Sequence, residues 1–124
     1  MSNTISIREL ATEARQLAQE QPDRQAVCSY VRFEGGQMVP NCIVGQAAFN
    51  LGISLEDLYE YNQCGIRHLA DNVQPEWLSI SEDEDDRVRL TWLGTLQGAQ
   101  DGHESWGEAL RIADRRIVMG QFGI

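Results

Sequence analysis

The sequence predicts a mostly α-helical protein, with about five helices and one small antiparallel β-hairpin in a single compact helical domain over residues 1–124. Apolar residues recur three and four positions apart in several segments, which is the spacing of one helix face. Ser residues precede such segments with Glu or Asp three positions later, the pattern of a helix capping box. One further stretch places strand-forming residues around two adjacent glycines, which favours a hairpin.

The clearest helix is predicted over residues 5–20. Ser6 and Glu9 match a capping box, and Ile5 with Leu10 matches the hydrophobic staple that often accompanies one. The apolar face of this helix needs a partner surface within the same domain. Its residues are Ile7, Leu10, Ala11, Ala14, Leu17 and Ala18.

Residues 27–39 are predicted to form the hairpin, because they are rich in strand-favouring valine and aromatic side chains. The expected turn is Glu34–Gln37, in which Gly35 and Gly36 supply the positive φ angles that tight hairpin turns require. Pro40 ends the returning strand.

A short buried helix is predicted next. Asn41 is a good N-cap residue, and Gly52 stands where a left-handed residue is wanted after the last turn. Between these two residues only Gln46 and Asn50 are polar, and apart from Gly45 all the others are apolar, which is typical of a core helix. Gly45 inside the helix predicts that another backbone packs closely there. The apolar residues are Cys42, Ile43, Val44, Ala47, Ala48, Phe49 and Leu51.

A second capping box, Ser54 with Asp57, predicts a short helix that runs through about Tyr61. Residues 66–72 are expected to form one or two more turns, and residues 72–75 a loop. The side chains expected to face inward from the short helix are Leu55, Leu58 and Tyr59.

An acidic stretch starts the next helix, which continues to Gln100. Ser81 is predicted to cap it, and residues 82–86 then stand in the first turn, where carboxylates complement the helix dipole. Gly94 and Gly98, one turn apart, suggest a close helix crossing. The expected apolar face is Val88, Trp92, Leu93, Leu96 and Ala99.

The last helix is predicted to begin after Ser105, with Glu108 as its capping-box partner, and to end at Gly120. It forms a helical hairpin with the helix before it. Its expected inner face is Trp106, Ala109, Leu110, Ala113 and Ile117. The three tryptophans of the chain are expected to serve the core.

The composition disfavours several functional classes. Ten basic residues against 19 acidic ones give a net charge of −9, which argues against direct binding to nucleic acid or to an anionic membrane. No run of about 20 apolar residues predicts a membrane span, and the N-terminus lacks a secretion signal pattern. Three cysteines, an odd number, agree with a reducing compartment. We therefore expect a cytoplasmic protein without a cofactor.

Two segments, Tyr30–Gly52 and Leu96–Leu110, resemble a group of short uncharacterised proteins from actinobacteria and their phages. The pattern of the group is an aromatic strand, a Gly turn, C-[IV]-V-G-x-A and L-G-[IV], followed later by L-Q-x-x-Q-D-x-G-x-x-W-G-x-A-L. The resemblance covers about a third of the chain. It implies a context and no activity: a phage or mobile-element accessory protein acting in a bacterial cytoplasm.

Cys42 is the candidate for catalysis. A thiol at a helix N-terminus can have a lowered pKa and act as a nucleophile, and cysteine peptidases of the NlpC/P60 type place a Cys at such a helix start. His103 is the candidate base of this thiol hydrolase. Against it, those folds follow the Cys helix with strands, whereas the chain downstream of Cys42 is predicted to be helical.

Cys64 and His68 are the candidate metal ligands, because a spacing of four residues puts two side chains on one helix face. Cys28 and Cys42 could complete a set of four. A structural zinc site normally shows paired short spacings, which this chain lacks, so we expect no bound metal.

The function expected from these observations is protein–protein interaction with an unidentified partner, a host protein if the chain is phage-encoded. The last predicted helix carries apolar residues on two sides, and the tail after it ends in apolar residues. Either the tail folds back over the helices, or the chain forms a homodimer. The expected interaction patch is Ile112, Arg116, Met119 and Phe122. An acidic DNA mimic is a further alternative, which requires the carboxylates to be arrayed across one face.

Overall fold

The computed structural model describes residues 4–26 and 29–117. Over these residues the chain forms six α-helices, a π-helical segment and two two-stranded sheets, which confirms the predicted mostly helical fold with a small hairpin. The helical segments are α1 (Ile7–Glu20), α2 (Ile43–Asn50), α3 (Leu55–Glu60), α4 (Ile66–His68), η1 (Leu69–Val73), α5 (Glu84–Asp101) and α6 (Trp106–Arg116). The strands are β1 (Ile5–Ser6), β2 (Val31–Glu34), β3 (Gln37–Pro40) and β4 (Leu78–Ser79).

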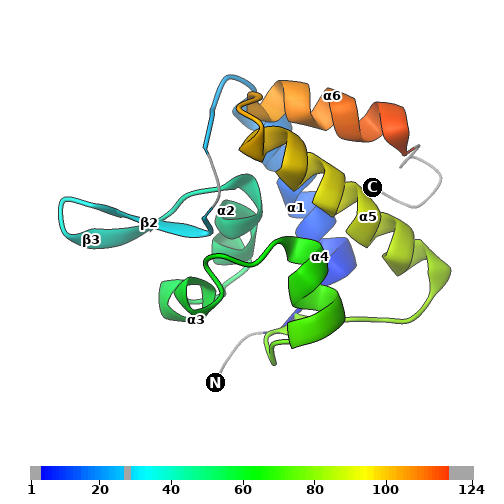
Figure 1. Cartoon of the computed structure of the whole chain (residues 1–124), viewed down its shortest axis with the longest axis horizontal. Coiled ribbons are helices and arrows are strands. Elements are labelled where there is room, and N and C mark those ends of the chain that lie inside the picture. The colour runs from blue at the N-terminus through cyan, green and yellow to red at the C-terminus, as the bar shows by residue number, and fades with distance from the viewer. Residues whose placement is uncertain (1–3, 27–28, 118–124) are drawn as a thin grey trace.

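The main core lies where α1, α5 and α6 pack together, with α2 on the other side of α1 (Figure 1). The predicted apolar face of α1 is fully buried, and the capping box of Ser6 with Glu9 is present. All three tryptophans are buried, as predicted. Within the described part of the chain, no helix combines the length and apolarity needed to cross a bilayer.

One strand pairing was not predicted. Ile5 and Ser6 precede α1 and pair in parallel with Leu78 and Ser79, so the start of the chain is held against the segment that leads into α5. A pairing of two residues per strand is too short to leave an alternating pattern in the sequence.

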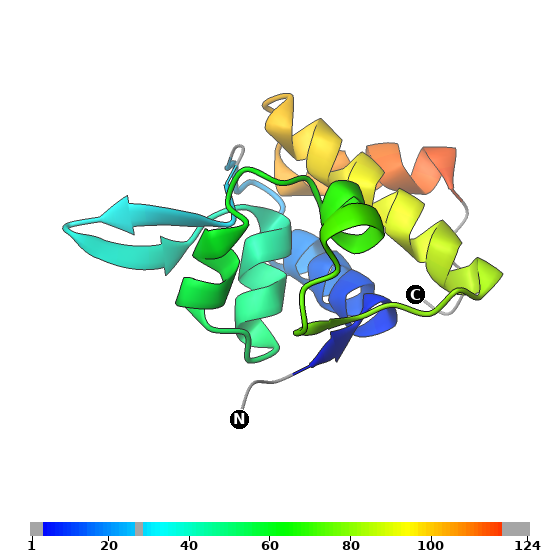
Figure 2. The ribbon, with the colours of Figure 1, turned by 60° about the horizontal axis from the view of Figure 1, so that its bottom comes forward.

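The β2–β3 hairpin extends away from the helices (Figures 1 and 2). Its register pairs Glu34 with Gln37, and Gly35 and Gly36 take φ angles of 58° and 82°, as predicted for the tight turn. The first two residues of the predicted hairpin segment, 27 and 28, lie outside the described residues.

The prediction of a close approach at Gly45 is confirmed, because a Cβ placed there would lie 2.3 Å from the Tyr30 carbonyl oxygen. The predicted N-cap is wrong by one residue. Cys42 caps α2, and the Asn41 side chain is held instead by the backbone and hydroxyl oxygens of Ser29. Phe49 is 40% exposed, since α2 is covered on only part of its circumference.

The segment around α3 agrees with the prediction except at its surface. The Ser54 side chain accepts the Asp57 N–H, and the helix ends at Glu60. Leu58 is buried, whereas Tyr59 is 48% exposed and does not face inward. Helical structure after α4 continues to Val73, the second residue of the predicted loop.

The cap of α5 is Asp83 and not Ser81. The Asp83 carboxylate accepts the Asp86 N–H, and the Ser81 hydroxyl accepts the Asp83 N–H one step earlier. The buried face of α5 is also more polar than predicted, because its neighbours supply partners for polar side chains. The polar residues buried on α5 are Asp86, Arg89, Gln97 and Gln100.

The predicted close helix crossing at Gly94 and Gly98 is found only at Gly94, and there a side chain makes the contact. A Cβ at Gly94 would lie 2.6 Å from Cδ of Arg67, so this glycine makes room for one long side chain of α4, which packs against α5. A Cβ at Gly98 would meet no atom within 4 Å.

The helical hairpin of α5 and α6 is confirmed, but α6 ends earlier than predicted. Its last residue is Arg116, and Ile117 is extended; Gly120 lies outside the described residues. In the turn between the two helices His103 takes a φ of 77°, a conformation that favours glycine. The second motif quoted above has glycine at this position.

Candidate functional site

The structure argues against Cys42 as a nucleophile. The Cys42 thiol is fully buried, and its sulfur accepts the Gly45 N–H at 3.3 Å. Burial raises the pKa of Cys42 to about 12, so the thiol stays protonated at neutral pH. His103 is exposed in the turn after α5. A protonated thiol without access to solvent cannot attack a substrate, and the thiol hydrolase interpretation is therefore not retained.

Cys64 and His68 were predicted to share one helix face, and the structure contradicts this. Helix α4 begins only at Ile66, so half-buried Cys64 precedes the helix, and His68 is exposed. Cys28 lies outside the described residues. No group of three or more His, Cys, Asp or Glu side chains among residues 4–26 and 29–117 is placed to hold a metal ion.

The predicted interaction patch is only partly described. Ile112 and Arg116 line a groove of about 490 Å³ between α5 and α6, together with Gly94, Gly98 and the exposed side chain of Arg67. Met119 and Phe122 lie outside the described residues. The patch therefore remains a prediction.

The acidic stretch before α5 has structural roles. Asp83 caps the helix, and Asp86 is buried against Arg89 at 2.7 Å. One carboxylate of this stretch, Asp86, is thus buried and paired with a cation, and the exposed Asp83 has a capping role, which weakens the DNA-mimic alternative.

The most exposed large apolar side chains of the described chain lie elsewhere. Phe33 on β2 is 58% exposed and Tyr59 on α3 is 48% exposed. Their rings meet edge to face, with centroids 5.6 Å apart and planes at 85°. Half-buried Met38 lies directly opposite Phe33 in the hairpin register. We call Phe33, Met38 and Tyr59 the aromatic surface.

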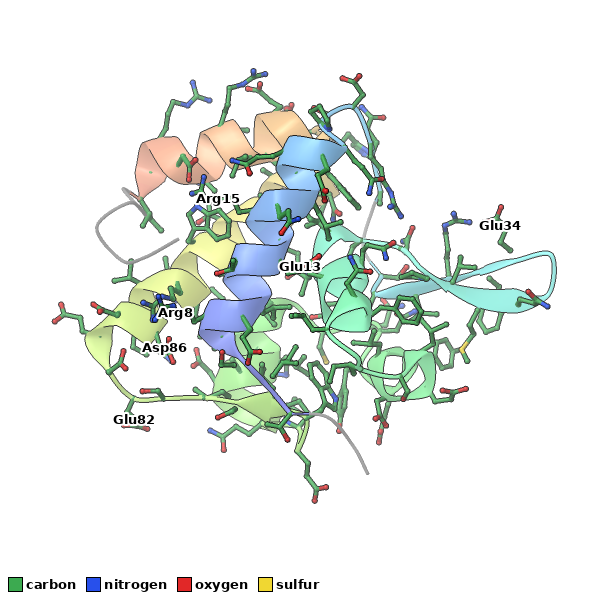
Figure 3. All side chains as sticks on the ribbon, turned by 180° about the vertical axis from the view of Figure 1, so that it is seen from behind. Arg8, Glu13, Arg15, Glu34, Glu82 and Asp86 are labelled. Atoms are coloured by element: carbon green, nitrogen blue, oxygen red, sulfur yellow. The ribbon has the colours of Figure 1, made fainter. Side chains whose placement is uncertain are left out.

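The hairpin register determines which side chains share this face. Residues directly opposite each other and residues two apart lie on the same face of a sheet, so Phe33 and Met38 share the face of buried Val31. Arg32 and Glu34 lie on the other face and form an ion pair at 2.7 Å. Figure 3 shows Glu34 far out on the hairpin.

A side chain anchors the hairpin to the helical part of the molecule. The Asn62 amide oxygen accepts the Val31 N–H at 2.8 Å, and the Asn62 amide nitrogen donates to the Val31 carbonyl oxygen at 3.0 Å. The amide thus pairs with β2 as a neighbouring strand would. Asn62 comes two residues after the end of α3, so its contact with Val31 also fixes the position of α3 relative to Phe33.

Comparisons of the chain with protein-family models, with curated proteins and with solved structures found no match. The role of the aromatic surface therefore rests on the chemistry of its own residues.

The aromatic surface lies next to negative charge. Glu56 on α3 is exposed, three residues before Tyr59 and so on the same side of the helix. No residue of α3 is basic, and Arg32 is already paired with Glu34. A surface with apolar side chains at its centre and carboxylates around it favours partners with the opposite charge.

Sequence reasoning missed the pairing of Phe33 with Tyr59. The strand pattern alone shows that Phe33 alternates with Arg32 and Glu34, and it places Phe33 on the side of Val31. The strand pattern does not show how far the hairpin extends beyond the helices, and so it does not show that Phe33 is exposed. Tyr59 follows the buried Leu58, and a six-residue helix is too short for the apolar period to decide which of them faces inward.

Proposed function

We propose that this protein is a binding module that recognises a partner protein through the aromatic surface. The observation that carries the proposal is the exposure of Phe33 and Tyr59 in direct edge-to-face contact on two adjoining elements. Single exposed apolar side chains are ordinary on protein surfaces, but a contiguous exposed pair of large aromatic rings is typical of interaction sites.

The contacts around the pair support a role in binding. Aromatic side chains at the centre of an interface contribute much of its affinity, because they bury a large area with few rotatable bonds. The Asn62 contact with Val31 and the contact of the hairpin with α3 hold the two rings in one arrangement before a partner arrives. Less side-chain and loop conformational freedom is then lost on binding, which favours affinity.

A second copy of this chain fits the surface poorly. A symmetric dimer across the aromatic surface would bring the Glu56 side chains of both copies together, and each copy carries a net charge of −9. Like charges across an interface cost affinity. The partner we propose is therefore a different protein with a basic surface. From the resemblance to actinophage proteins we take it to be a host protein met by a phage or mobile-element accessory protein.

The test uses a photo-crosslinking amino acid placed at Tyr59. In lysate of the native host it should crosslink to a defined partner, whereas the same amino acid at Phe49 should not. Phe49 is the matched control, because it is 40% exposed but lies on α2. Phe33→Ser should abolish the crosslink from Tyr59 and leave the circular dichroism spectrum unchanged.

Equal crosslinking from both positions would show a non-specific surface and contradict the proposal. A Tyr59 crosslink that survives Phe33→Ser in a folded variant would remove the aromatic surface from the interface.

A further inference from the structure

A second feature lies on the other side of α3, in a pocket of about 390 Å³ between the end of α3 and the segment after η1. A volume of this size lies within the range of sites for small molecules or single side chains. The residues that line it are Asp57, Glu60, Tyr61, Val73, Gln74, Pro75, Glu76 and Trp77.

The pocket lining is negatively charged. It contains the carboxylates of Asp57, Glu60 and Glu76, and none of the lining residues is Arg or His. Burial raises the pKa of Tyr61, and the charges of Glu60 and Asp57 raise it further. A negative potential therefore acts on the same ring that lines the pocket.

The aromatic walls add a second, independent preference. The ring centroids of Tyr61 and Trp77 lie 6.5 Å apart, and the ring planes meet at an angle of 53°. Trp77 is only 6% exposed. Aromatic faces attract organic cations through their π electrons, and nearby carboxylates strengthen the attraction.

The backbone holds this arrangement in place. Gln74 takes the left-handed conformation at φ 53°, and its N–H donates to the Leu69 carbonyl oxygen, so the chain turns sharply after η1. The Trp77 carbonyl oxygen then accepts the Ile5 N–H at 2.9 Å, next to the β1–β4 pairing. The wall that carries Glu76 and Trp77 is thereby fixed to the start of α1.

We propose that this pocket binds an organic cation, a guanidinium or alkylammonium group, supplied by an arginine or lysine side chain of the partner protein. The assignment of that group to a partner rests on the proposed function. We assign the cation to the same partner because the two sites lie on one helix: α3 carries Tyr59 on the aromatic surface, and it carries Asp57 and Glu60 on the pocket. One basic segment with an apolar residue can therefore contact both sites.

The experiment observes the indole N–H signals of the full-length protein by nuclear magnetic resonance. The chain has three tryptophans, and Trp77→Phe identifies the Trp77 signal. The probe is the peptide acetyl-Ala-Arg-Ala-amide, compared at constant ionic strength with the same peptide carrying neutral citrulline in place of arginine. The arginine peptide should shift the Trp77 signal saturably and leave those of Trp92 and Trp106 in place.

Removing charge from the pocket should weaken this binding. Glu60→Gln and Glu76→Gln keep the shape of exposed side chains, and each should raise the dissociation constant by up to about fivefold. The matched control is Glu20→Gln, the same change at the exposed end of α1, and it should have no effect.

Four results would overturn the proposal. An equal shift with the citrulline peptide, or none with the arginine peptide, would exclude cation recognition. A shift reproduced by magnesium chloride would indicate a metal site. Binding of methylguanidinium as tight as that of the peptide would assign the pocket to a free small cation and not to a partner's side chain.

The pocket and the aromatic surface can be tested separately. Phe33→Ser should leave the arginine-peptide shift unchanged, because Phe33 does not line the pocket. If the arginine peptide binds while Tyr59 crosslinks to nothing, the pocket stands and the partner assignment falls. If Tyr59 crosslinks while the peptide leaves Trp77 unmoved, the aromatic surface stands without a cation pocket.

Discussion

Two glycines in helix interiors differ sharply in what surrounds them. Gly45 in α2 lies against the Tyr30 backbone, with a would-be Cβ 2.3 Å from its oxygen and 2.7 Å from its Cα. Gly98 in α5 has no neighbour within 4 Å of a would-be Cβ. Backbone atoms cannot move aside as a flexible side chain can, so the same substitution should act in opposite directions at these two positions.

We predict that Gly45→Ala lowers the free energy of unfolding by about 3 kcal/mol or more, because α2 must separate from the Tyr30 backbone that precedes β2. Gly98→Ala should raise it by about 0.5–1 kcal/mol, since alanine is the better helix former. Urea unfolding followed by circular dichroism measures both. A stabilised Gly45→Ala variant would mean that α2 and Tyr30 are not packed as described.

The Cys42 thiol should give the protein a characteristic loss of stability in base. Its pKa is raised from 9.0 to about 12 in the folded state by burial, so the folded chain holds this proton more tightly than the unfolded chain. The resulting stability is fully present below pH 9 and is lost as pH rises towards 12. For this group alone the free energy of unfolding should fall by about 1.4 kcal/mol per pH unit in that window.

Urea unfolding at a series of pH values tests this, with Cys42→Ala as the control. The variant should be less stable at neutral pH, and it should lose stability less steeply in base because it lacks the thiol. Some loss in base should remain, because the pKa of the buried Tyr30 hydroxyl is also raised. Parallel curves for the two proteins would show that the Cys42 thiol ionises freely in the fold.

At the scale of elements, the hairpin depends on one amide. Asn62 satisfies both backbone groups of Val31 from outside the sheet. A buried backbone group without a partner costs about 1–3 kcal/mol, and Val31 is 1% exposed. We predict that Asn62→Ala destabilises the protein by about 1–3 kcal/mol and accelerates hydrogen exchange at the Val31 amide. The neighbouring change Gln63→Ala, at an exposed position, is the control and should do neither.

At the scale of the whole molecule, the side chains of Asp114 and Gln100 each link separate helices. Arg15 of α1 pairs with Asp114 of α6 at 2.6 Å, and the Trp92 indole N–H of α5 donates to the same carboxylate at 2.9 Å. Figure 3 shows Arg15 on the side of α1 that faces α6. Fully buried Gln100 accepts the N–H of Ile43, at the start of α2, and the indole N–H of Trp106.

We predict that Gln100→Leu costs about 2–5 kcal/mol, although it adds apolar volume to the core. The change leaves the Ile43 N–H and the Trp106 indole N–H without an acceptor, at about 1–3 kcal/mol each. Gln16→Leu, on the exposed face of α1, should stay within about 0.5 kcal/mol of the parent. Denaturant unfolding decides: a Gln100→Leu variant as stable as the parent would show that these donors find other partners.

Local signals account for the parts of the fold that were predicted. The capping box at Ser6, the Gly35–Gly36 turn and the left-handed Gly52, at φ 104°, each depend on residues within a few positions of one another. Errors arose where two local candidates competed, as with Ser81 and Asp83 before α5. A hydroxyl and a carboxylate two residues apart can both cap a helix, and only the complete set of bonds selects one.

The sequence by itself determined the helical class, the hairpin, the core tryptophans and the close approach at Gly45, because periodicity, caps and glycine conformation act over short distances along the chain. Only the tertiary structure decided between Cys42 as a core residue and Cys42 as a nucleophile, and only it showed that Phe33 meets Tyr59 and that an acidic pocket forms beside Trp77. Solvent exposure and the meeting of residues far apart in sequence depend on how the elements pack against one another. No local pattern encodes that packing, and a candidate binding surface assembled from three separate elements, β2, β3 and α3, is therefore recognised only in the folded chain.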